Sequence, residues 1–105
     1  MSDRIAEYLE KVRSRPEDTL ARYVLAKDYF DGGAHEEAVV QFRELVRRKP
    51  DWMKAYIHLG ESLLALGRPD EARPVLEQAL ALARAQSHTG PAGEIAERLA
   101  SLGRG

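Results

Sequence analysis

Residues 22–45 read RYVLAKDYFDGGAHEEAVVQFREL, and residues 56–79 read YIHLGESLLALGRPDEARPVLEQA. The two stretches begin thirty-four residues apart and superimpose without a gap. The matching positions are Leu25 and Leu59, Ala26 and Gly60, Tyr29 and Leu63, Gly33 and Gly67, Glu37 and Glu71, Ala38 and Ala72, and Phe42 and Leu76. A unit of two helices joined by a turn is therefore predicted to occur twice.

The composition favours helices throughout the chain. Apolar residues make up 44% and charged residues 31% of the 105 positions. Ala, Leu, Glu and Arg, which are strong helix formers, are abundant, whereas aromatic and β-branched residues are sparse. The length suits one domain, so we expect a single all-α domain over residues 1–105.

Apolar residues at helical spacing, interrupted by proline and glycine, predict six helices. They are expected within 2–15 and over 19–30, 35–49, 52–66, 69–86 and 90–103, with a polar loop over 87–91. Asp51 is expected to cap the fourth helix, and Gly67 to end it. Pro69 suits the first turn of the fifth helix, whereas Pro74 lies deeper and predicts a bend or loose bonding there.

The period and the small and aromatic positions resemble the tetratricopeptide repeat, a thirty-four-residue helical hairpin. The positions that match the family's pattern in the second stretch are Tyr56, Leu59, Gly60, Ala72 and Ala79. The first stretch departs from it with Arg22 at the bulky position and Leu45 in place of Ala. The resemblance implies a right-handed α-solenoid of antiparallel helix pairs. Its parts are a half repeat at 2–15, full repeats at 16–49 and 50–86, and a terminal capping helix at 90–103.

In proteins similar to this one, peptides or partner helices lie in a concave groove lined by the first helix of each repeat. The matching positions here are Leu20, Tyr23, Val24, Lys27, Phe30, Lys54, Ile57, His58, Glu61, Leu64, Glu94 and Glu97. Tyr23 and Phe30 share one helix face because they are seven residues apart. These positions predict an apolar, partly aromatic groove that is basic at its beginning and acidic toward its end. The alternative is that some of the apolar side chains only pack on neighbouring helices.

Trp52 follows Asp51, where the repeat usually carries a small or polar residue. One interpretation is that its ring packs over the turn between repeats. The other is that it stays exposed and anchors an interface, as tryptophan often does. The sequence leaves both open.

Charge and residue types argue against several functions. The net charge of −1 gives no overall attraction for nucleic acid, and no cysteine is present. None of the three histidines, His35, His58 and His88, has the neighbours that a metal site or a nucleophilic site needs, so we expect no metal, cofactor or catalytic residue. No long apolar run suggests a membrane segment, and a cytoplasmic location is expected.

The resulting hypothesis is a non-enzymatic module that binds another protein or peptide in the groove. Replacing Tyr23 and Phe30 by Ala is expected to abolish binding and to leave the helices intact. Self-association is the alternative, because half repeats at both ends could stack on a second copy. An enzyme is the third hypothesis, and a cluster containing His58 and Glu61 would be its sign.

Overall fold

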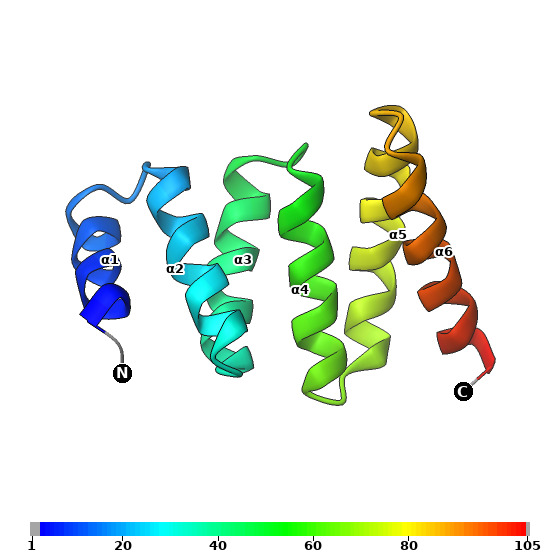
Figure 1. The fold of residues 1–105 in the computed structure, drawn as a ribbon, viewed down its shortest axis with the longest axis horizontal. Coiled ribbons are helices and arrows are strands. Elements are labelled where there is room, and N and C mark those ends of the chain that lie inside the picture. The colour runs from blue at the N-terminus through cyan, green and yellow to red at the C-terminus, as the bar shows by residue number, and fades with distance from the viewer. Residues whose placement is uncertain (1–2, 105) are drawn as a thin grey trace.

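The computed structural model describes residues 3–104, and the predicted half repeat 2–15 therefore begins one residue outside it. Within this range the helices are α1 (Asp3–Ser14), α2 (Thr19–Asp31), α3 (His35–Arg48), α4 (Met53–Ala65), α5 (Pro69–Ala85) and α6 (Thr89–Arg104). They stand side by side in a row, with the two termini at opposite ends (Figure 1). Each helix packs against its neighbour in the chain, and α2 also contacts α4. The predicted all-α helical solenoid is confirmed.

Two glycines end the first helices of the two full repeats. Gly33 and Gly67 have φ angles of 78° and 71°, a region that glycine enters without steric cost. The Arg68 N–H then donates to the Leu63 carbonyl at 2.9 Å, so the last turn of α4 is closed as expected. At the end of α5, Ser87 takes the same conformation, with φ of 60°.

Two predicted helix starts are wrong. Trp52, not Asp51, occupies the N-terminal cap position of α4, and its side chain makes no capping hydrogen bond. The sixth helix begins at Thr89, inside the stretch expected to be a loop. Pro91 permits this start because it lies in the first turn, where the helix needs no N–H donor.

Pro74 lies inside α5, which runs unbroken from Pro69 to Ala85. Because proline has no N–H, the carbonyl of Asp70 cannot accept the usual helical bond from residue 74. Both residues are exposed, so water can reach that carbonyl. A bend at Pro74 stays a prediction.

The core runs along the row and contains five large side chains that are almost fully buried: Leu25, Phe42, Leu45, Leu63 and Leu76. Gly60 allows α4 and α5 to approach closely. A Cβ atom at Gly60 would lie 2.5 Å from Cδ2 of Leu76, well inside ordinary contact distance. This explains why the repeat has a small residue at this position.

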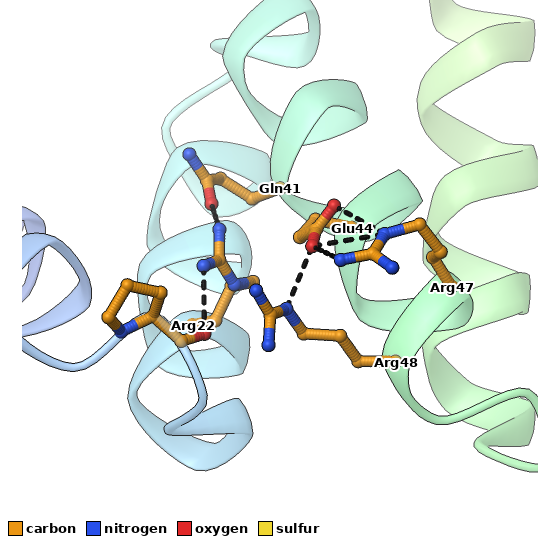
Figure 2. A network of polar contacts seen from close by, with 6 residues as sticks. Arg22, Gln41, Glu44, Arg47 and Arg48 are labelled. Atoms are coloured by element: carbon orange, nitrogen blue, oxygen red, sulfur yellow. Dashed lines mark hydrogen bonds and ion pairs between the residues drawn. The ribbon is translucent and has the colours of Figure 1, made fainter.

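Arg22 stands where the second repeat has Tyr56, and it is only 8% exposed. Its guanidinium donates to Oε1 of Gln41 at 2.8 Å and to the carbonyl of Pro16 at 3.0 Å (Figure 2). Burial is the main cause that lowers the pKa of Arg22 below its ordinary value. The polar side chain therefore fills a bulky position by joining three segments through hydrogen bonds.

The basic residues near the end of α3 are engaged within their own helix. Arg47 and Arg48 both form ion pairs with Glu44. The hydrogen bond from Arg47 is the main cause that lowers the pKa of Glu44 to about 2. These cations therefore match the expected pattern of charge at a helix C-terminus.

Candidate protein-binding groove

Aromatic rings from three helices and one turn gather where the two full repeats meet. The ring of Trp52 stacks on Tyr23 of α2, with centroids 4.8 Å apart. The ring of His58 on α4 lies 5.0 Å from Phe30 and 5.5 Å from Phe42. Three of the predicted groove residues, Tyr23, Phe30 and His58, are thus brought together in one cluster.

This aromatic cluster is part of the packing between repeats. Tyr23, Phe30 and Trp52 are half-buried and pack against the core. Burial is the main cause that raises the pKa of Tyr23. Because these rings support the fold, replacing Tyr23 and Phe30 by Ala should lower stability as well as any binding, so that variant is no clean test of the groove.

Four other predicted residues meet in a pocket between α4 and α6. Its volume is about 170 Å³, and the predicted residues in its lining are Lys54, Ile57, Glu61 and Glu94. Five further residues line it that the sequence did not assign to the groove: Met53, Leu76, Pro91, Ile95 and Arg98. Arg98 follows Glu94 by four residues on α6, so helical spacing was a signal that could have identified it.

Two side chains approach the carboxylate of Glu61 at this α4–α6 pocket. Nδ1 of His58 lies 3.4 Å from Oε1 of Glu61, and Arg98 approaches the other oxygen of Glu61 at 3.4 Å. The contact with His58, and then the charges of His58 and Arg98, lower the pKa of Glu61 although burial opposes the shift. Glu61 is therefore ionised at neutral pH and links α4 to α6.

The rim of the α4–α6 pocket carries charges without ion partners. Lys54 and Glu94 are exposed, and neither forms an ion pair with any residue in 3–103. Glu97 lines a shallow hollow beside Glu94 on the outer side of α6. A ligand with both charges could therefore meet a basic group on α4 and acidic groups on α6.

The remaining predicted residues lie elsewhere. Leu20 is 68% exposed and, with Val24, lines a hollow between α1 and α2. Lys27 pairs with Asp31 one turn along its own helix, at 2.7 Å. Leu64 packs against the core. Nine of the twelve predicted residues thus divide among the aromatic cluster, the α4–α6 pocket and a separate α1–α2 hollow, and Lys27, Leu64 and Glu97 belong to none of the three.

Residues 3–104 contain neither a metal-binding cluster nor a membrane-spanning helix. No group of three or more His, Asp or Glu side chains there is placed to hold a metal ion. No helix in the same range has the length and apolarity needed to cross a membrane.

Comparison with known proteins agrees with this architecture. A tetratricopeptide repeat domain protein from Salinibacter ruber has a solution structure that is 30% identical to this chain. The match covers 83% of this chain and 88% of that chain, with a TM-score of 0.72. For its crystal structure the identity is 28%, the coverage is 81% of this chain and 96% of that chain, and the TM-score is 0.72.

A protein from Bordetella parapertussis has the same fold, with 23% identity over 99% of this chain and 90% of that chain and a TM-score of 0.80. No curated protein matches this sequence. A sequence profile described as "tetratricopeptide repeat" matches residues 23–97. Because that match spans most of its length, the chain belongs to the tetratricopeptide repeat family.

Proposed function

We propose that this chain binds a peptide or helix of another protein along α2, α4 and α6, with the α4–α6 pocket as the main contact. Tetratricopeptide repeats generally act as non-catalytic modules in protein–protein interactions. The observation that carries the proposal is the α4–α6 pocket, where Ile57 and Ile95 meet the charged residues Lys54 and Glu94.

The dimensions and chemistry of the pocket indicate how it would hold a ligand. Its volume of about 170 Å³ suits one large apolar side chain of the ligand. Lys54 and Glu94 stand on opposite helices at its rim, so they would orient a segment that carries an acidic group toward α4 and a basic group toward α6. Next to the pocket, His58 of the aromatic cluster contacts Glu61 in the pocket lining.

Selection from a random peptide library, with the purified chain as the target, provides a defined ligand for a test. The affinity of the selected peptide is then measured by calorimetry for the chain and for the variants Lys54→Glu and Glu94→Lys. Each reversal should weaken binding about tenfold, because an attractive rim charge becomes repulsive. Glu77→Lys is the matched control, since Glu77 is exposed on α5 and lines no part of the pocket.

An equal loss in Glu77→Lys, or full affinity in both rim variants, would show that the groove assignment is wrong. All three residues are exposed, so these changes remove no core contact.

Self-association stays a second hypothesis, but the structure offers little in its favour. The exposed residues of α1 are mostly charged, among them Glu7, Glu10 and Arg13. Burying such a surface against a second copy would require charge pairing at every position. Light scattering on a sizing column at high protein concentration is expected to give the mass of a monomer.

A further inference from the structure

A second and larger hollow lies where α1, α2 and α3 meet, next to the turn that joins α2 to α3. Its volume is about 690 Å³, and most of its surface is apolar. The residues around it are Arg4, Ile5, Asp28, Tyr29, Gly32, Ala34 and Glu37. This α1–α3 hollow shares no residue with the α4–α6 pocket.

The repeat shows what fills the corresponding place one unit further along. In the second repeat, Leu66 corresponds to Gly32 and Arg68 corresponds to Ala34. The side chain of Leu66 packs against the core. Nε of Arg68 donates to Oε2 of Glu71 at 2.5 Å. In the second repeat an aliphatic side chain and a guanidinium from the chain itself therefore occupy this position.

The backbone does not require glycine at position 32. Gly32 has φ of −84° and ψ of 1°, and Leu66 has φ of −86° and ψ of 2°. A Cβ atom at Gly32 would meet only two carbonyl oxygens of its own helix, at 3.4 Å and 3.8 Å. A leucine would therefore fit this conformation, so glycine at this position leaves out a side chain that the backbone could carry.

The glutamate at this position occurs in both repeats, but only Glu71 of the second repeat is paired with cations. Glu71 pairs with Arg68 and with Arg43 of α3, at 2.5 Å and 3.0 Å. The corresponding Glu37 has Ala34 in place of Arg68, is exposed, and has no ion pair with a residue in 3–103. The second carboxylate of the hollow, Asp28, is already paired with Arg4 of α1 at 2.8 Å, so Glu37 alone leaves the lining with a net negative charge. The rim of the hollow therefore favours a cation.

We infer that the α1–α3 hollow is a second protein-binding site, which takes a partner segment carrying an aliphatic residue two positions before an arginine. The aliphatic group lies along Ile5 and Tyr29, in the place that Leu66 fills in the next repeat. The guanidinium pairs with Glu37, as Arg68 pairs with Glu71.

The test uses the tripeptide acetyl-Leu-Gly-Arg-amide, which has the sequence of residues 66–68. The chain contains three isoleucines, Ile5, Ile57 and Ile95, so a sample labelled at their δ1 methyl groups reports on both sites. The peptide is expected to give a saturable shift of the Ile5 signal while the signals of Ile57 and Ile95 stay in place. Acetyl-Leu-Gly-Gln-amide should bind about threefold more weakly, because it lacks the charge that pairs with an exposed carboxylate.

Two substitutions of Gly32 separate the effect of filling the hollow from the effect of replacing the glycine itself. Gly32→Leu should weaken binding at least tenfold because its side chain fills the hollow, whereas Gly32→Ala should bind nearly as the unchanged chain does. Glu37→Gln should remove the preference for the arginine peptide, and it gives an independent test if Gly32→Leu fails to fold. The inference is overturned if the Ile5 signal does not saturate, if Gly32→Leu binds normally, or if Ile57 and Ile95 respond instead.

Discussion

The close approach of α4 to α5 predicts that one small substitution will have an unusual sign. Alanine is normally better than glycine inside a helix, by about 1 kcal/mol. At Gly60, however, the new methyl group would lie 2.5 Å from Cδ2 and 2.7 Å from Cγ of Leu76, which is only 1% exposed. Overpacking of this kind costs about 1–3 kcal/mol. With the helical gain subtracted, Gly60→Ala should lower the free energy of unfolding by up to about 2 kcal/mol.

The matched control is Gly93→Ala on α6. A Cβ atom at Gly93 meets nothing within 4 Å, so only the helical preference acts there. This variant should gain about 0.5–1 kcal/mol. Urea unfolding followed by circular dichroism at the helix signal measures both variants, and in thermal melts each kcal/mol should move the midpoint by about 5 °C.

A second substitution tests whether Leu76 is the cause of the predicted loss. Leu76→Ala alone should cost about 2–5 kcal/mol, because it leaves a cavity in the core. In that background the clash is gone, so Gly60→Ala should become stabilising. A Gly60→Ala variant more stable than the parent chain, or one whose loss persists without Leu76, would refute the reasoning.

Three further changes test other parts of the structure. Arg22→Ala should lower the free energy of unfolding by about 2–3 kcal/mol in chemical denaturation, since two hydrogen bonds of a charged group are lost; no loss would contradict its structural role. Trp52→Ala should cost about 2 kcal/mol by removing the stacked ring from Tyr23, measured by thermal melting, and an unchanged midpoint would mean that the ring is free. The pKa of Glu44 is lowered from 4.5 to about 2 in the folded chain, so its contribution is present above pH 4.5 and is lost as the pH falls toward 2. Glu44→Gln should flatten the loss of stability in that interval, and an acid unfolding curve of unchanged slope would count against the ion pairs with Arg47.

The fold was accessible from the sequence because the repeat places small residues where helices touch. Gly33 and Gly67 end helices in the predicted conformation, and Ala72 and Leu76 pack as the pattern implies. The start of α4 was not accessible, because Asp51 has the better capping chemistry but the chain turns at Trp52, whose ring stacks on Tyr23. The stacking of Trp52 on Tyr23 therefore accompanies a start of α4 that the capping preferences of the residues do not predict.

The site was only partly accessible. Helical spacing identifies Lys54, Ile57 and Glu61 as one face of α4, but the residues that α6 places opposite them depend on where that helix begins. The α1–α3 hollow is a different case. The pairing of Gly32 with Leu66 is visible in the repeat, but the volume of the hollow and the residues around it come only from the structure.

The most direct test of the proposed function uses the sample labelled at the isoleucine δ1 methyl groups, together with the peptide selected from the library. Intermolecular nuclear Overhauser effects are recorded between the peptide and each methyl group. Binding in the α4–α6 pocket predicts contacts to both Ile57 and Ile95, which line it from the two facing helices. A bound peptide that contacts neither methyl group would contradict the proposal.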